Sequence, residues 1–162
     1  MKRIFSIIAI CLLSLTSWMA AEADAQNKLF SKYNEIDNVD YICITKSMLK
    51  LLGNSSATVN GVHIEGITNA IDVILIINSR NEEVKEMMKK DYKALSSNPD
   101  YEVLMQAKSD GERITTLLNA TKAEKEVVMH IDEKDELTFI VLTGKFTDEQ
   151  LKKLLDGNKK GK

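Results

Sequence analysis

Cysteine and tryptophan are scarce in this chain of 162 residues, which contains two cysteines and one tryptophan. Cys11 and Trp18 both lie in an N-terminal segment that we expect to be removed, which leaves Cys43 alone and excludes an intramolecular disulfide. Cys43 lies in the apolar run Tyr41–Ile44, so we expect it to pack in the core as a small hydrophobic residue. The alternatives are a reactive thiol or an intermolecular bridge. The lack of a remaining tryptophan argues against a carbohydrate-binding face, which usually stacks aromatic rings on sugars.

An excess of positive charge is also absent. The formal net charge is −2 at pH 7. The N-terminal segment contains two basic residues, Lys2 and Arg3, and two acidic ones, Glu22 and Asp24, so its removal leaves the balance unchanged. Such a charge does not predict nucleic-acid binding. Lysines are concentrated in residues 158–162, which we expect to form a flexible basic tail rather than a phosphate- or lipid-binding patch.

The N-terminal segment has the parts of a secretory signal peptide. Lys2 and Arg3 supply positive charge, Ile4–Leu15 is a nearly unbroken apolar run, and Ala23-Asp24-Ala25 fits an A-x-A cleavage site. We therefore expect residues 1–25 to be a signal peptide. The protein is expected to be exported, to the periplasm or outside the cell.

Neither a lipid anchor nor a membrane span is expected in the exported chain. Cys11 lies inside the apolar run, directly after Ile10, which is the wrong place for a lipid-modified cysteine. After cleavage the longest apolar run is Val73–Ile77, which is too short to cross a bilayer. The rest of the chain, residues 26–157, has the length of one ordinary domain with its own core.

Hydrophobic periodicity and turn residues predict ten elements in this domain. Their order is helix, strand, helix, strand, helix, four strands and a final helix. The expected ranges are 27–34, 39–44, 46–52, 70–77, 80–95, 101–107, 113–118, 126–131, 137–143 and 147–156.

Several local signals mark the ends of these elements. Ser79 and Glu82 fit a capping box, as do Thr147 and Gln150, with Phe146 and Leu151 placed as a hydrophobic staple around the second box. The pair Asp110-Gly111 predicts a tight hairpin turn. The polar segment Asn54–Asn69 is interpreted as a long loop with a short strand near Val62–Ile64.

This order of elements predicts an α+β fold. The expected architecture is a two-layer sandwich, with one mixed, mostly antiparallel sheet of about six strands and helices on one face. The strand Ala70–Ile77 is apolar at every position except Asp72 and is expected in the interior of the sheet. The last four strands are expected to form a meander with one more polar face.

Four segments together resemble a known family. They are Leu29–Tyr33, Ile42–Leu49, Tyr101–Met105, and Gly144-Lys145-Phe146 with Leu151 and Leu154 behind it. Their order and spacing resemble domain-of-unknown-function family 4252, small exported proteins of the Bacteroidota, over about Leu29–Leu155. The resemblance implies export and a compact α+β domain, and it brings no catalytic motif. Many relatives are lipoproteins with a cysteine after the signal, a pattern from which this chain departs.

The residues that could carry chemistry are few. His63 is followed by Glu65, and His130 by Asp132 and Glu133, which is fewer ligands than a zinc site needs. The charged run Asp132–Glu136 lacks the central glycine of a calcium loop and is expected to be a hairpin turn. The sequence therefore assigns no catalytic, metal-binding or cofactor-binding residue, and no cofactor.

The leading hypothesis for function is a non-enzymatic envelope protein that binds an unknown protein or a small amphiphilic ligand. Its surface would be the polar sheet face or the Asn54–Asn69 loop, because long loops are often functional. The alternatives are a component of an envelope-stress regulatory pathway and, less favoured, a metal-assisted or hydrolytic enzyme acting through His130. Convergence of four residues in one concave pocket would favour the enzyme. They are Glu102, Arg113, Glu126 and His130.

Overall fold

The computed structural model of the chain describes residues 29–52, 58–59 and 61–158. The chain divides into two compact units, Met1–Asp37 and Asn38–Lys162, which are described separately. The expected signal peptide, its cleavage site and residues 159–162 of the basic tail lie outside the described residues. In the first unit, residues 29–31 are helical and lead into the 3-10 helix η1 (Lys32–Glu35), as the helical spacing of Leu29, Phe30 and Tyr33 predicts.

The second unit contains the elements that the periodicity predicts, together with short additions in the segment expected to be a loop. In chain order they are β1 (Asp40–Thr45), α2 (Lys46–Leu52), β2 (Thr58–Val59), β3 (Val62–His63), η2 (Thr68–Ala70), β4 (Ile71–Ser79), α3 (Glu82–Ser96), β5 (Tyr101–Ser109), β6 (Glu112–Asn119), β7 (Lys125–Asp132), β8 (Leu137–Gly144) and α4 (Asp148–Asn158). No helix in the described ranges is long and apolar enough to span a membrane.

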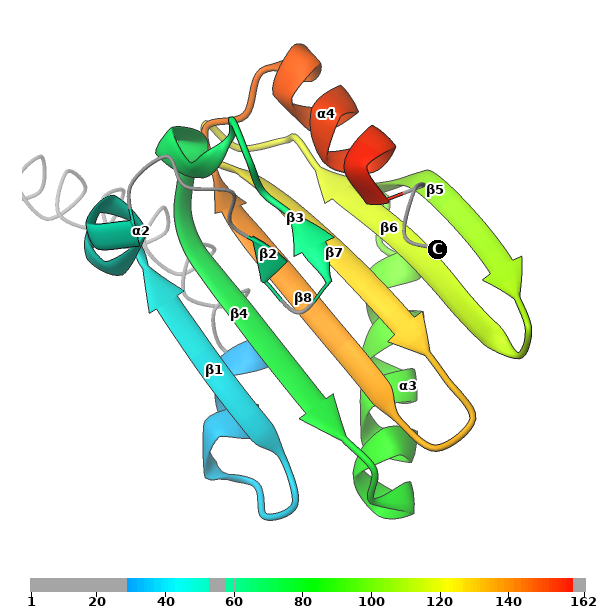
Figure 1. Cartoon of the computed structure of the whole chain (residues 1–162). Coiled ribbons are helices and arrows are strands. Elements are labelled where there is room, and N and C mark those ends of the chain that lie inside the picture. The colour runs from blue at the N-terminus through cyan, green and yellow to red at the C-terminus, as the bar shows by residue number, and fades with distance from the viewer. Residues whose placement is uncertain (1–28, 53–57, 60, 159–162) are drawn as a thin grey trace, which may run out of the picture. The chain divides into compact units, whose positions relative to one another are not determined.

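Six strands form one sheet in the order β1-β4-β8-β7-β6-β5, and β2 and β3 form a separate two-stranded hairpin (Figure 1). The predicted α+β class with a six-stranded sheet is confirmed. All five strand pairs are antiparallel, so the sheet is not mixed. β4 lies between β1 and β8, in the interior position that its apolar sequence predicts.

Both faces of this sheet are covered, whereas helices were expected on one face. α3 crosses behind the sheet in Figure 1, while α4 and the β2–β3 hairpin lie in front of it. We call these the α3 face and the α4 face. The α4 face carries the main core cluster, which includes Ile74, Ile140 and Leu154. The reason is that β4, β7 and β8 are apolar at consecutive positions, so each face needs its own cover.

The expected polar face of the last four strands is therefore wrong for β6, β7 and β8. In each of these strands four or more consecutive residues are buried, which means that both faces are inside the protein. Only β5, the edge strand among these four, is mostly exposed. Its sequence alternates in the same way as that of its neighbours, so position in the sheet decides its exposure.

Within the segment expected to be a loop, residues 61–69 contribute to the core. Val62, Ile64 and Ile67 are all buried and belong to the main core cluster on the α4 face. The expected short strand near Val62–Ile64 is confirmed as β3, which pairs with β2. The described part of this segment therefore helps to cover the α4 face of the sheet.

Of the two predicted capping boxes, the one at the start of α3 is wrong and the one at the start of α4 is confirmed. At α3 the cap is Asn81, whose Oδ1 accepts from the amides of Glu83 at 3.0 Å and Val84 at 3.2 Å. The expected Ser79–Glu82 box is wrong, because the Ser79 hydroxyl instead donates to the Asn38 carbonyl at 2.7 Å.

The capping box of α4 is confirmed. The Thr147 hydroxyl accepts from the Gln150 amide at 3.2 Å, and the Gln150 side chain accepts from the Thr147 amide at 2.9 Å. Phe146 and Leu151, the expected staple, are both buried in the main core cluster. The box and the staple together fix the start of α4 over the sheet.

Replacing Thr147 with alanine is expected to lower the free energy of unfolding by about 1 kcal/mol, because the Gln150 amide then loses its acceptor. Urea denaturation followed by circular dichroism measures the change. Thr147→Ser keeps the hydroxyl, so its free energy of unfolding should fall much less. Equal losses in the two variants would show that the hydroxyl does not stabilise the helix.

Candidate functional site

A cavity of about 310 Å³ opens on the α4 face beside the β2–β3 hairpin. Its floor is apolar and comes from strands β5, β6 and β7 and from the hairpin, namely Met105, Ile114, Met129, Ile131 and Val62. Its rim carries three carboxylates, Glu112, Glu133 and Glu136, and Gly61 and Thr138 complete the lining. We call it the acidic cavity. None of its lining residues is a lysine or an arginine.

Two hairpin turns place the carboxylates at this rim. Asp110 and Gly111 have φ values of 47° and 91°, as a tight two-residue turn requires, and the next residue is Glu112. The predicted turn at this pair is therefore confirmed. The run Asp132–Glu136 forms the β7–β8 turn, as expected, and the Glu133 amide donates to the Glu136 carbonyl at 2.9 Å. Neighbouring hairpins thus bring Glu112 and Glu133 to the same end of the sheet.

The three carboxylates differ in their partners. Arg80 Nε donates to Glu136 Oε2 at 2.8 Å, and Asn78 donates to Glu136 as well, so these bonds lower the pKa of Glu136. Burial and the neighbouring charges of Glu112 and Glu136 raise the pKa of Glu133. Among the described residues no ion pair is found for Glu112 or Glu133. Arg80 opposes the rise in the pKa of Glu133, and Arg80 and Lys134 line a hollow together with all three carboxylates, so the negative charge of the rim is partly balanced by the protein itself.

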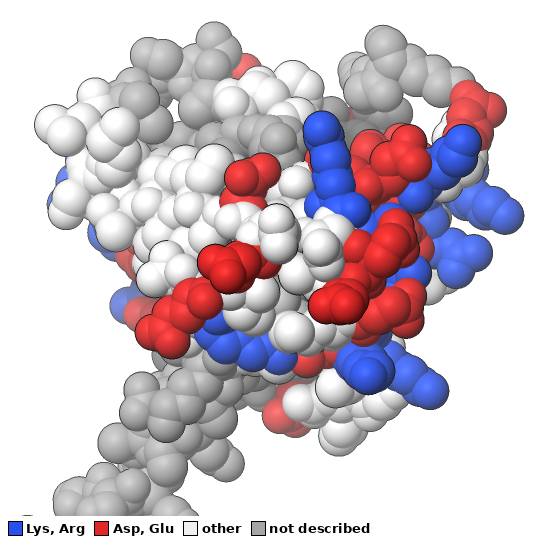
Figure 2. Space-filling view, turned by 90° about the horizontal axis from the view of Figure 1, so that it is seen from below, with Lys and Arg blue, Asp and Glu red and all other residues white. Residues whose placement is uncertain are grey.

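A second hollow of about 500 Å³ shares Glu136 with the acidic cavity. It reaches Ile42 on the edge strand β1 and Ile76 on β4. Ile42 is 50% exposed on this edge strand. Figure 2 views the molecule from below and shows both acidic and basic side chains beside uncharged surface.

Thr116 lies next to the acidic cavity and is fully buried. Its cross-strand neighbours are Met105 on β5 and Met129 on β7, which both contribute to the cavity floor. Its hydroxyl oxygen has no hydrogen-bond partner in the protein. Such an orphaned hydroxyl is uncommon in a core, because leaving it unpaired costs stability.

His130 lies on β7, where the more polar face expected for the last four strands is not found. The residue is 3% exposed and lies on the α3 face, where its ring stacks on Tyr92 with centroids 4.0 Å apart. Both ring nitrogens are buried without a hydrogen-bond partner. Burial lowers the pKa of His130 to about 4, with Asp132 opposing and Arg113 and Lys89 adding to this effect. At neutral pH it is an uncharged aromatic residue of the core.

The four residues whose convergence would favour an enzyme do not line one pocket. Glu102 pairs with Leu118 on the α4 face, whereas His130, Arg113 and Glu126 lie on the α3 face. Glu126 accepts a hydrogen bond from the Tyr101 hydroxyl, and burial raises the pKa of this carboxyl. This hydrogen bond ties Glu126 on β7 to Tyr101 on β5, across the intervening strand β6.

The other histidine and the acidic residues are also dispersed. His63 is exposed on β3, with its Nδ1 3.3 Å from the Thr58 hydroxyl across the hairpin. Among the described residues there is no group of three or more histidine, cysteine, aspartate or glutamate side chains arranged to hold a metal ion.

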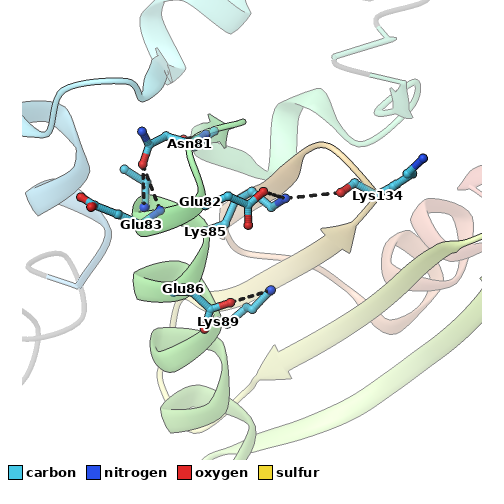
Figure 3. A network of polar contacts seen from close by, with 9 residues as sticks. Asn81, Glu82, Glu83, Lys85, Glu86, Lys89 and Lys134 are labelled. Carbon is cyan, nitrogen blue, oxygen red and sulfur yellow. Dashed lines mark hydrogen bonds and ion pairs between the residues drawn. The ribbon is translucent and has the colours of Figure 1, made fainter.

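A charged network at the start of α3 was not predicted. Lys85 is 3% exposed, and its ammonium donates to Glu82 at 2.8 Å and to the Lys134 carbonyl at 3.4 Å (Figure 3). Lys89 pairs with Glu86 one turn later, at 2.8 Å. The network ties α3 to the β7–β8 turn, which carries the rim residue Glu133. The sequence signal for a buried Lys85 is its helical spacing from Met88 and Leu95, which places Lys85 on the same side of α3 as these apolar residues.

Cys43 is exposed, so the expectation that it packs in the core is wrong. The apolar run that contains it forms β1, which is an edge strand of the sheet. Cys43 points to the opposite face from Ile42 and Ile44, and its cross-strand neighbour is Leu75. An edge strand is covered less than an interior one of the same composition.

We expect a maleimide reagent to label Cys43 rapidly in the native protein, at a rate similar to that in urea, because the thiol is already exposed. Mass spectrometry over a time course measures the rate. Cys43→Ser serves as the control that assigns the labelled position. Slow labelling in the native state with fast labelling in urea would contradict the exposed position.

Comparison with known protein families gives a match over most of the chain. The model of a family described as a domain of unknown function (DUF4252) matches residues 33–154. The match spans β1 to α4 and includes every strand that lines the acidic cavity. Neither a curated protein nor a solved structure matches the chain.

Proposed function

The chain belongs to this family of unknown function, and from the geometry of its α4 face we propose that it is an exported, non-enzymatic binding protein. The binding surface in this proposal is the acidic cavity together with the hollow at Ile42. The function would be exercised in the periplasm or outside the cell. The observation that carries the proposal is an apolar floor that opens to solvent beneath three carboxylates.

The composition of the cavity supports binding rather than chemistry. Binding sites are usually concave and mostly apolar, with a few polar groups that fix orientation. The acidic cavity has this composition, with an apolar floor and carboxylates at its rim. The β2–β3 hairpin forms one wall, so part of the segment Asn54–Asn69 contributes to the proposed surface.

Capture of partners from an envelope extract tests the proposal. The wild-type protein is compared with Ile114→Gln, which places an amide on the partly exposed cavity floor. A matched control, Ala94→Gln, places the same side chain at an exposed position on α3. A partner that is recovered with the wild type and the control and lost with Ile114→Gln supports the site. Recovery of the same partners with all three proteins contradicts it.

Export has its own test. We expect the protein isolated from the cell envelope to have an intact mass that corresponds to a chain beginning at Gln26, with no acyl group, because Ala23-Asp24-Ala25 fits the cleavage site. A mass that includes residues 1–25 would contradict removal of the signal. A mass that corresponds to an acylated Cys11 would contradict the absence of a lipid anchor.

A further inference from the structure

We propose that two copies of this chain associate through the free edge of β1, so that their sheets join into one continuous antiparallel sheet. We call the line along which the two β1 strands meet the β1 seam. The inference goes beyond the binding function proposed above, because the floor of the acidic cavity comes from β5, β6, β7 and the hairpin and not from β1. The hollow at Ile42 borders the seam.

The two edges of the sheet differ in how they are protected against pairing. Edge strands expose unpaired backbone amides and carbonyls, and proteins usually protect them with lysine, proline or a bulge. β5 contains Lys108, and its register with β6 shifts at a bulge between Val103 and Met105. β1 contains no lysine, arginine or proline, and it pairs with β4 in unbroken register. In the described part of the chain β4 is its only sheet neighbour, so β1 is the edge that can accept another strand.

Large apolar side chains are exposed around the same edge. Ile42 is 50% exposed, and α2, which directly follows β1, exposes Met48 and 83% of Leu51 (Figure 1). These are three of the four large apolar side chains that are exposed in the described residues, and the fourth is Val103 on β5. Apolar side chains that are exposed together often mark a surface that contacts another protein.

Symmetry limits the ways in which β1 can pair with a second β1. Two identical antiparallel strands in one sheet are related by a twofold axis perpendicular to the sheet, which keeps both α4 faces on the same side. Each residue must then lie opposite a residue whose side chain points to the same face, and side chains alternate between the faces along a strand. One residue near the middle of β1 must therefore lie opposite its own copy. The choices are Ile42, Cys43 and Ile44.

Charge complementarity selects the pairing centred on Cys43. In this register Ile42 lies opposite Ile44 of the second copy, and Asp40 lies opposite Lys46, the first residue after the strand. Each contact occurs twice, so two apolar pairs lie between two ion pairs. Pairing centred on Ile42 would place Asp40 opposite Ile44, and pairing centred on Ile44 would place Ile42 opposite Lys46. Both of these set a charge against an apolar side chain.

The two charged groups are accessible to a second copy. Asp40 is exposed and has no ion pair among the described residues, and Arg80, which shares a hollow with it, donates to Glu136 at 2.8 Å. The side chain of Lys46 is 52% exposed and donates to Asp72 on β4. An ammonium group has three donors, so Lys46 can bind Asp72 and the second copy's Asp40 together.

Sedimentation velocity over a series of protein concentrations tests the association. Ile42→Lys places an ammonium group in the seam, and Val103→Lys is the matched control, because Val103 is 52% exposed on the other edge strand. We expect the wild type and Val103→Lys to form dimers, and Ile42→Lys to associate at least about tenfold more weakly. A wild type that stays monomeric at every concentration, or an Ile42→Lys variant that dimerises as the wild type does, would overturn the inference.

An exchange of charges tests the register. Asp40→Lys and Lys46→Glu each place like charges opposite one another at both ends of the seam, so each variant alone should dimerise at least about tenfold more weakly. In an equal mixture of the two variants every facing pair is again of opposite charge, so we expect mixed dimers. A folding defect, including one from the lost Lys46–Asp72 bond, cannot produce this recovery. Absence of mixed dimers would contradict the register.

Cys43 reports the centre of the seam. Residues that lie opposite one another in antiparallel strands have Cα atoms about 4.5–5.5 Å apart, within reach of a short ethylene-bridged bismaleimide that adds one thiol at each end. Both thiols point out of the α3 face, so reagents still reach them in the dimer. We expect a covalent dimer on a denaturing gel with the wild type and Val103→Lys, formed at least about tenfold more slowly by Ile42→Lys. Equal cross-linking rates in all three proteins would contradict the β1 seam. Circular dichroism confirms that each variant is folded.

Discussion

Replacing Gly144 with alanine is expected to lower the free energy of unfolding by about 3 kcal/mol, because the added methyl group overlaps the backbone. A Cβ atom at this position would lie 2.0 Å from the Ala70 carbonyl oxygen and 3.0 Å from the Ile71 Cα. Both atoms belong to the backbone, so no side-chain rotation relieves the overlap.

The overlap has a large effect because several elements meet at this point. Gly144 is the last residue of β8, and the next amide, that of Lys145, donates to the Ala70 carbonyl at 2.9 Å. The added methyl group must therefore push apart the start of β4 and the chain that enters α4. Both segments carry core residues of the α4 face.

Urea denaturation of Gly144→Ala and of a second glycine variant measures this effect. Gly66 has a φ of +75° and open space around it, so Gly66→Ala should cost only about 1 kcal/mol, from backbone strain alone. A loss in Gly144→Ala no larger than that in Gly66→Ala would show that β4 and β8 can separate easily at this end.

The second large effect is a loss of stability in acid that depends on His130. The folded protein holds the pKa of His130 at about 4, below its ordinary value of 6.5, so the unfolded chain takes up a proton first as the pH falls. The contribution of the neutral His130 to the free energy of unfolding is fully present above pH 6.5 and is lost between pH 6.5 and pH 4. The difference in pKa corresponds to about 3 kcal/mol.

The variant His130→Phe isolates this contribution, since phenylalanine keeps an aromatic ring against Tyr92 and does not titrate. We expect its free energy of unfolding to fall about 3 kcal/mol less than that of the wild type between pH 7 and pH 4. The control is His63→Gln, which removes the exposed histidine. Urea denaturation at several pH values measures all three proteins. Superimposable pH profiles of the wild type and His130→Phe would contradict the buried, neutral histidine.

Periodicity and turn chemistry were sufficient to predict the order of the main helices and strands. The alternation from Tyr101 to Thr143 and the pair Asp110-Gly111 are local signals, and the structure confirms four strands with a tight turn at that pair. The box at Thr147 is likewise a pattern of adjacent residues. Such features depend on a few neighbouring residues, which is why a single sequence shows them.

What could not be predicted depends on which elements become neighbours. Cys43 lies in as apolar a run as many core strands, but β1 forms the edge of the sheet, and nothing within the run distinguishes an edge from an interior strand. His130 is buried because α3 crosses the sheet and places Tyr92 against it. The alternation of His130 with Met129 and Ile131 predicted that it lies on the opposite face of the strand from them, but not which element covers that face.

The candidate site escaped sequence analysis for the same reason. Glu112 and Glu133 are separated by a whole hairpin in the sequence, and each looks like an ordinary turn residue. Their approach depends on the pairing of β6 with β7 and on the hairpin that walls the cavity. The signal that was available is the long segment before β4, whose scattered apolar residues were interpreted as a loop.

The pairing of β4 with β8 also determines the order in which the protein can fold. The chain must make α3 and three further strands after β4 before β8 exists, so the pairing closes a long loop. The chain is synthesised from its N-terminus. The apolar strand β4 (Ile71–Ser79) therefore lacks its neighbour β8 until that last strand has been made. Native structures dominated by such long-range strand pairing form slowly. The segment most prone to aggregation is the apolar strand that stays unpaired for longest, here β4.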